Sequence, residues 1–122
     1  MTRSQHAIDL KHQGCNCCQA VLMAHADLLR LPEAELMRLG SAFGLGMGNM
    51  EGPCGALCAA QMVAGLLADD ARQQAKRIIG QFAQQAGSTT CKVLKGNSSS
   101  SPLCSCDDCV RIAVEAVAPL VV

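Results

Sequence analysis

The chain has 122 residues, of which 50% are hydrophobic and only 2% aromatic, and its ten basic residues balance ten acidic ones. This length predicts one domain, residues 1–122, and the scarcity of aromatic rings favours close-packed helices over sheets. Neutral charge and missing stacking surfaces argue against nucleic-acid binding. A polar first segment and the absence of a long apolar run predict a cytoplasmic protein without membrane insertion.

The first half of the chain predicts helices over residues 2–13, 17–30 and 32–42. Asn16 and Gln19 have the spacing of a capping box, which places Cys17 at the first position of the second helix. Pro32 suits the first position of the third helix. We interpret His25 as a solvated or core residue rather than a ligand. The expected inner faces of the last two helices consist of Ala20, Val21, Ala24, Leu28, Leu36, Leu39, Ala42 and Phe43.

Alternating glycines interrupt the helical pattern over residues 44–52. No strand precedes them and no Gly-Lys-Ser or Gly-Lys-Thr follows, so a nucleotide-binding loop is not expected. Two interpretations remain open for this loop. Its backbone passes close to another group, such as a cofactor, or it is a plain flexible connection.

The central helix is expected from Pro53 to about Leu67 and to be buried, because it is apolar on nearly every side. With Pro53 at the first helical position, Cys54 lies in the first turn, where free N–H groups and the helix dipole favour a thiolate. Cys58 follows one turn later on the same face. Dense packing of a Gly-, Ala- and Cys-rich core explains the same residues equally well.

Three further helices and a loop complete the chain. A helix over about residues 70–86 ends at Gly87, and a short helix capped by Thr90 has Cys91 first. Residues 96–103 have the composition of a flexible loop. Ser105 is the expected cap of a last helix with Cys106 and Cys109 on one face. The predicted inward residues of these helices are Ile78, Ile79, Phe82, Ala86, Val93, Leu94, Ile112, Ala113 and Ala116.

These patterns predict an all-α fold, a compact bundle of about five to six helices with cysteines at helix N-termini. Nine cysteines are the most unusual feature of the chain. In a reducing compartment, dense cysteine indicates metal or thiol redox chemistry, and an odd number excludes a fully paired disulfide scaffold in one chain. Helix N-termini stabilise negative charge, as an anionic thiolate-bound cluster requires, although chance clustering of nine cysteines is the alternative.

The segment 16–21, the glycine-rich loop, Cys54-Gly55-Ala56 and two later cysteines resemble the C-GCAxxG-C-C family of redox-active proteins. The resemblance spans roughly residues 14–118. These are small bacterial and archaeal proteins, often from anaerobes. The resemblance implies that the family's four cysteines are Cys17, Cys54, Cys91 and Cys109. A related module of split-Soret cytochromes is associated with an iron–sulfur site, which implies the same cofactor here.

The chain departs from the family pattern in three ways. Ala59 stands where the CGAxxG motif ends in Gly, and Cys18 follows Cys17 where the family usually has Ala. Five cysteines lie outside the common four, namely Cys15, Cys18, Cys58, Cys104 and Cys106. These extra thiols could support a larger or second cluster, or supply a resolving partner for a disulfide.

The first functional hypothesis is a small iron–sulfur redox protein for electron transfer, redox sensing or cluster storage. Thiolates are soft ligands for such clusters, and four of them complete a 2Fe–2S or 4Fe–4S site. The expected ligands are Cys17, Cys54, Cys91 and Cys109, with Cys58, Cys106 and Cys104 in reserve. Such a protein needs a redox partner protein, and the bundle could form a homodimer.

Two other hypotheses remain. Cys106 and Cys109 form a CxxC at a helix start, as in thiol–disulfide oxidoreductases, but the βαβ context is missing, and Asp107 and Asp108 should raise thiol pKa values. A thiolate zinc site would use the CxC and CxxC pairs, although structural zinc sites commonly pair two CxxC motifs. No His/Asp/Ser constellation indicates catalysis, so a redox or cluster-binding protein is favoured over a substrate-transforming enzyme.

Overall fold

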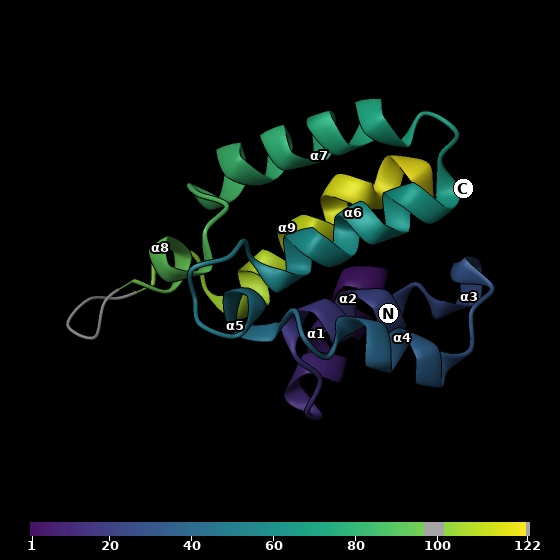
Figure 1. The fold of residues 1–122 in the computed structure, drawn as a ribbon, viewed down its shortest axis with the longest axis horizontal. Helices are drawn as coiled ribbons and strands as arrows, with labels where there is room; N and C mark the ends of the chain where they lie inside the picture. The colour runs from purple at the N-terminus through teal and green to yellow at the C-terminus, as the bar shows by residue number, and fades with distance from the viewer. Residues whose placement is uncertain (97–101, 122) are drawn as a thin grey trace.

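The computed structural model describes residues 1–96 and 102–121, and within them it consists of helices, turns and loops without a β-strand. The all-α prediction is confirmed, and six of the helices have eight residues or more (Figure 1). The helices are α1 (Arg3–His12), α2 (Cys17–Ala24), α3 (Ala26–Leu29), α4 (Glu33–Gly40), α5 (Gly44–Met47), α6 (Gly55–Leu67), α7 (Ala71–Ala86), α8 (Cys91–Lys95) and α9 (Cys106–Val117), followed by the 3₁₀ turn η1 (Ala118–Leu120).

Helix α6 lies at the centre of the bundle and packs against α2, α7 and α9. Figure 1 shows α7 on one side of the α6–α9 layer and helices α1, α2 and α4 on the other. The buried residues of α6 are mostly glycine and alanine, which lets neighbouring helices approach closely. The predicted buried central helix is therefore confirmed, except at its end, where the Leu66 side chain is exposed.

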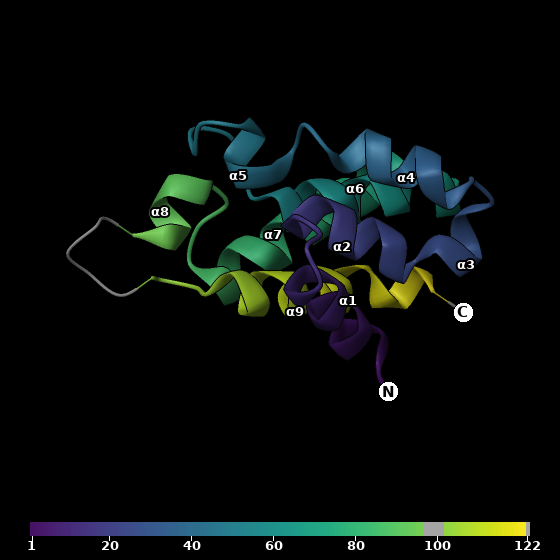
Figure 2. The same cartoon turned by 90° about the horizontal axis from the view of Figure 1, so that it is seen from below.

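The short helices α5 and α8 lie together at one end of the bundle, as Figures 1 and 2 show from two directions. The chain approaching α6 bonds to the chain approaching α8: Pro53 and Thr90 form an isolated antiparallel bridge. The N–H of Cys54 donates to the Thr89 carbonyl at 2.8 Å. These bonds bring together two cysteine-bearing segments that are distant in the sequence.

The predicted helix over residues 17–30 is wrong in its continuity, because α2 ends at Ala24 and α3 begins at Ala26. His25 is fully buried, and its Nδ1 contacts the Val21 carbonyl at 2.7 Å. In a continuous helix, the His25 N–H would donate to the Val21 carbonyl. The His25 ring occupies that carbonyl, and the His25 N–H donates to the Leu22 carbonyl instead. Of the two expected environments for His25, solvated or core, the structure shows the core.

Several expected inward residues are exposed, namely Leu39, Ala42, Ile79 and Val93. Ile79 and Val93 are direct neighbours of the buried Ile78 and Leu94. Successive helical residues point about 100° apart, so both members of such a pair cannot face one core. Pro32 lies at the N-cap of α4 rather than at its first position. Most of the expected 96–103 loop, residues 97–101, lies outside the described residues.

Candidate functional site

Six cysteines line one small cavity of about 30 Å³ at the α5–α8 end of the molecule. We call it the cysteine cavity. Its lining residues are Cys17, Cys54, Cys91, Cys104, Cys106 and Cys109, with Leu45, Gly46, Gly55, Leu94 and Lys95. The four cysteines expected as ligands and two of the three reserves therefore lie together, although they come from segments spread over the whole chain.

The start of α2 positions Cys17 through the predicted capping box. The N–H of Gln19 donates to Asn16 Oδ1 at 2.8 Å, and the Asn16 N–H donates to Gln19 Oε1 at 3.0 Å. The Asn16 amide also donates to the Gly40 carbonyl at 3.1 Å, which ties this helix start to the end of α4. Cys17, the first residue of α2, is half-buried and faces the cysteine cavity.

Cys54 is the N-cap of α6 and not a residue of its first turn, because the helix begins at Gly55, two positions later than expected. Its backbone is not helical, with φ −56° and ψ 132°, and its N–H and Pro53 pair with the segment before α8. Cys58 therefore does not continue the direction of the Cys54 side chain, since the i, i+4 relation holds only inside a helix. Cys58 is half-buried and lies outside the cavity lining.

The glycine-rich loop contacts Cys91 directly. A Cβ atom at Gly46 would lie 2.5 Å from Cys91 Cβ and 3.3 Å from Cys91 Sγ, and Gly46 has φ +57°. The loop is bonded to α8 as well: the Cys91 N–H donates to Gly52 at 3.0 Å and the Lys92 N–H donates to Met50 at 2.9 Å. Close backbone approach is thus the correct interpretation of this loop, and the approached group is a cysteine.

The segment 104–109, which leads into α9, supplies three of the six thiols. Ser105 caps the helix by accepting the Asp108 N–H at 3.0 Å, as predicted, and Cys106 and Cys109 both face the cavity. Cys104 is held from outside the helix, since its N–H donates to the Leu94 carbonyl at 3.1 Å. This last bond joins the segment of Cys106 to α8, which begins with Cys91.

Two pairs of cavity thiols shift each other's pKa, and neither pair is the CxxC motif. Cys54 pairs with Cys109, and Cys106 pairs with Cys17. The Cys109 hydrogen bond, followed by the Leu57 and Ala56 N–H groups, lowers the pKa of Cys54 to about 7. The hydrogen bonds of Cys17 and then Lys95 lower the pKa of Cys106 to about 5.

The partner thiols shift in the opposite direction. The pKa values of Cys17 and Cys109 are raised, first by their hydrogen bonds to Cys106 and Cys54 and then by burial. Each pair therefore favours one thiolate held by one thiol. The expected rise from neighbouring aspartates does not decide the pKa of Cys106, which Cys17 and then Lys95 lower. Asp108 does raise the pKa of Cys104, after the larger effect of burial.

Sequence reasoning missed Lys95, whose ammonium hydrogen-bonds to Cys106 and lines the cavity. Burial opposes its charge, but this bond and the charges of three cysteines raise its pKa on balance. The available signal was its spacing, four residues after Cys91 on one helix, which places both side chains on one face.

Three cysteines lie apart from the cavity lining, namely Cys15, Cys18 and Cys58. Burial raises the pKa of Cys18 to about 12, and it raises those of Cys15 and Cys58 as well. Cys15 contacts Met37, with 4.0 Å between the sulfur atoms. These environments favour neutral thiols, as burial also does for Cys91 and Cys104 in the cavity lining. Among the nine cysteines, a lowered pKa is found at Cys54 and Cys106.

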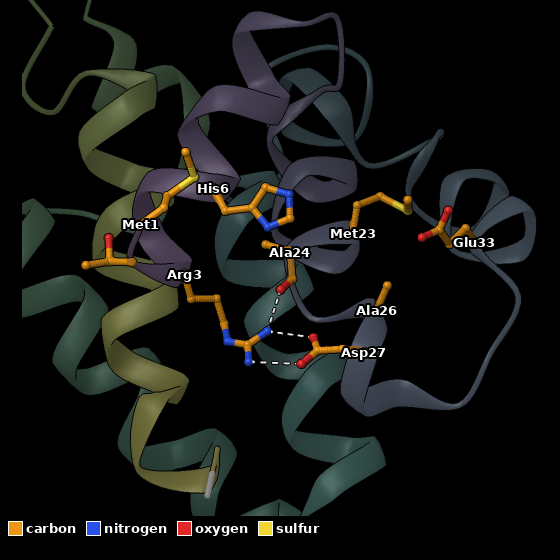
Figure 3. A pocket seen from close by; sticks show the side chains of 9 residues that line it. Met1, Arg3, His6, Met23, Ala24, Ala26, Asp27 and Glu33 are labelled. Atoms are coloured by element: carbon orange, nitrogen blue, oxygen red, sulfur yellow. Dashed lines mark hydrogen bonds and ion pairs between the residues drawn. The ribbon is translucent and has the colours of Figure 1, made fainter.

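A larger hollow of about 530 Å³ lies beside the N-terminus and contains no cysteine. Figure 3 shows Arg3 of α1 reaching across it to Asp27 of α3, at 2.7 Å, and to the Ala24 carbonyl. This ion pair ties α1 to the α2–α3 junction.

Across residues 1–96 and 102–121, no group of three or more Cys, His, Asp or Glu side chains is already gathered at metal-binding spacing. No helix in this part of the chain is long and apolar enough to cross a membrane.

Comparison with known proteins identifies the family. Residues 15–120 match the family described as "Putative redox-active protein (C_GCAxxG_C_C)". The chain belongs to the C_GCAxxG_C_C family. No curated protein and no solved structure matches it significantly. Family membership and the clustered thiols give this chain a redox role, and the four cysteines that the family resemblance implies all line the cysteine cavity.

Proposed function

We propose that this protein binds an iron–sulfur cluster at the cysteine cavity and uses it for electron transfer, redox sensing or cluster storage. The supporting observation is the convergence of six thiols from four chain segments on one cavity. Inert structural cysteines have no reason to meet in this way. Thiolates are the preferred ligands of iron–sulfur clusters, so the donor set fits this cofactor.

The ligands in this proposal are Cys17, Cys54, Cys91 and Cys109. Cys104 and Cys106 face the same cavity and are the available substitutes, whereas Cys58 is set aside because it lies outside the lining. When bound, the cluster would supply one-electron redox chemistry. Every other contribution comes from the chain, which positions the sulfurs and offsets their charge.

Positive charge at the cavity supports an anionic thiolate site. Lys95 lines the cavity, and the N–H groups of Leu57 and Ala56 favour the ionised form of Cys54. The start of α2 adds its dipole at Cys17. These groups would also tune the potential of a bound cluster, since nearby charge and N–H donors set cluster potentials.

The space between the thiols is small. A volume of about 30 Å³ has room for little more than water, so cluster binding requires the side chains to turn outward. Gly46 and Gly55 line the cavity without side chains, and a Cβ atom at either position would lie within 3 Å of a neighbouring atom.

The test is anaerobic purification followed by an ultraviolet–visible spectrum and by iron, acid-labile sulfide and zinc analysis. Brown protein with comparable amounts of iron and sulfide is expected. Cys54→Ala should lose the cofactor, whereas Cys58→Ala, one turn further and outside the cavity, should retain it. Zinc without iron, or unchanged cofactor in Cys54→Ala, would reject the proposed site.

A further inference from the structure

Exposed apolar side chains gather at the end of the bundle that holds the cysteine cavity. Four of the nine large apolar residues exposed in the described part of the chain belong here, each 50–57% exposed. They are Leu45 and Met47 of α5, Val93 of α8, and Leu103 before α9. We call them the apolar rim, because Leu45 lines the cavity and each of the others adjoins a lining residue in the sequence. The other five are spread over the N-terminus, α4 and the turn before it, α6 and α7.

Backbone hydrogen bonds hold the segments of the apolar rim together. The Lys92 N–H donates to the Met50 carbonyl at 2.9 Å, which fastens α8 to the glycine-rich loop. The Cys104 N–H donates to the Leu94 carbonyl at 3.1 Å, which fastens the segment of Leu103 to α8. Figures 1 and 2 show α5 and α8 side by side from two directions. The rim is therefore built from three linked segments.

The backbone beneath two of the rim side chains is left-handed. Leu45 has φ +54° and Met47 has φ +61°, a region that bulky residues rarely adopt. This conformation costs stability, and so does the exposure of two apolar side chains to water. In the single chain each of the two residues stays about half exposed. Burial against another molecule would offset these costs, and exposed apolar patches commonly mark such contacts.

Two opposite charges accompany the apolar rim. Glu51 of the glycine-rich loop and Lys92 of α8 are both exposed. Within residues 1–96 and 102–121 neither forms an ion pair, whereas the nearby Asp107 lies 2.8 Å from His12. A face that carries one cation and one anion is complementary to a second copy of itself after a two-fold rotation. A partner whose face has a single charge sign would be repelled by one of the two.

We propose that two copies of this chain associate through the apolar rim, with Glu51 of one copy against Lys92 of the other. In a two-fold arrangement every contact occurs twice, so this one pair of residues gives two ion pairs. The association covers the side of the cysteine cavity that Leu45 forms and shields it from water. This inference goes beyond iron–sulfur binding and does not depend on it.

The test is sedimentation equilibrium of the full chain, purified anaerobically and kept with a reductant so that no disulfide joins two chains. We expect the average mass to rise with concentration from that of one chain towards that of two. Val93→Glu should weaken the association about tenfold or more, because it places a charge in an apolar contact twice. Ile79→Glu is the matched control and should have no effect, since Ile79 is an exposed β-branched residue of α7.

Charge reversal tests the orientation of the two copies. Glu51→Lys and Lys92→Glu should each weaken the association, and the double variant should restore it. Both positions are exposed, so these variants keep the test decisive even if Val93→Glu does not fold, which circular dichroism will show. In an equal mixture of isotope-labelled and unlabelled chains, a carbodiimide should join Glu51 to Lys92 between labelled and unlabelled peptides.

Three results would overturn the inference. They are the mass of one chain at every concentration, an association that a folded Val93→Glu leaves unchanged, and a double charge variant that associates no more tightly than the single ones. Iron and sulfide are measured separately on the same preparations. A chain that associates without iron contradicts only the cluster proposal, and an iron-containing single chain contradicts only this one.

Discussion

Gly46 runs so close to Cys91 that a Cβ atom at position 46 would lie 2.5 Å from Cys91 Cβ. No real pair of such carbons tolerates this separation, and the backbone of Gly46 is left-handed besides. The glycine-rich loop is therefore the wall of the cysteine cavity beside Cys91.

Gly46→Ala should destabilise the protein. Strain in the left-handed region costs about 1–2 kcal/mol and displacement of Cys91 adds to it, so we expect a loss of roughly 2–4 kcal/mol in urea unfolding. Gly80→Ala is the matched control, because Gly80 is helical and has open space around it. That control should be neutral or stabilising by up to about 1 kcal/mol. Equal stability of the two variants would contradict the described packing.

Lys95→Met should raise the pKa of Cys106 above its value of about 5. Removing the cation disfavours the thiolate, and loss of one close opposite charge shifts a pKa by roughly one to two units. The measurement is the pH profile of Cys106 alkylation, followed by peptide mass spectrometry. Lys92→Met on the same short helix should leave the profile unchanged, because Lys92 is exposed and does not line the cavity.

Asn16→Ala should weaken the start of α2. The capping box and the bond to Gly40 are lost together, at a cost of about 1 kcal/mol or somewhat more. Thr90→Ala provides the comparison, since Thr90 is an N-cap whose side chain makes no capping bond. In urea unfolding, Asn16→Ala should lose more stability than Thr90→Ala. Alkylation of Cys17 should become faster in Asn16→Ala and stay unchanged in Thr90→Ala.

Acid should destabilise the protein partly through His25. Burial lowers the pKa of His25, and its buried Nε2 has no hydrogen-bond partner among the described residues. Arg3, which faces the same junction, also disfavours the charged ring, while Asp27 opposes this effect. The unfolded chain thus binds the proton more readily, so this contribution is complete above the unfolded pKa, about 6.5, and declines as the pH falls below it.

The check for His25 is unfolding by urea at pH 7.5 and pH 5. His25→Gln should show a smaller loss of stability between these conditions than the unaltered chain. His6→Gln, at an exposed position of α1, should show the same loss as the unaltered chain. An identical pH dependence in all three proteins would mean that His25 does not contribute.

Local patterns predicted much of the helix framework. The caps at Asn16 and Ser105 and the stop at Gly87 were predictable because each depends on residues only a few positions apart. The break at His25 was not, since it depends on a ring buried by the surrounding helices. The prediction that Ile79 and Val93 face the core was wrong, because apolar character alone does not say which of two adjacent residues faces inward.

In the candidate site, too, some features depend on local sequence and others on tertiary packing. The residues alone predicted that several cysteines lie at or near helix starts, because the capping residues and glycines beside them act over one turn of chain. The pairing of Cys17 with Cys106 and of Cys54 with Cys109, and the contact of Lys95 with the first pair, follow only from tertiary packing. The physical reason is that these contacts depend on how α2, α6, α8 and α9 are arranged, and no local spacing encodes the distance between segments so far apart in the chain.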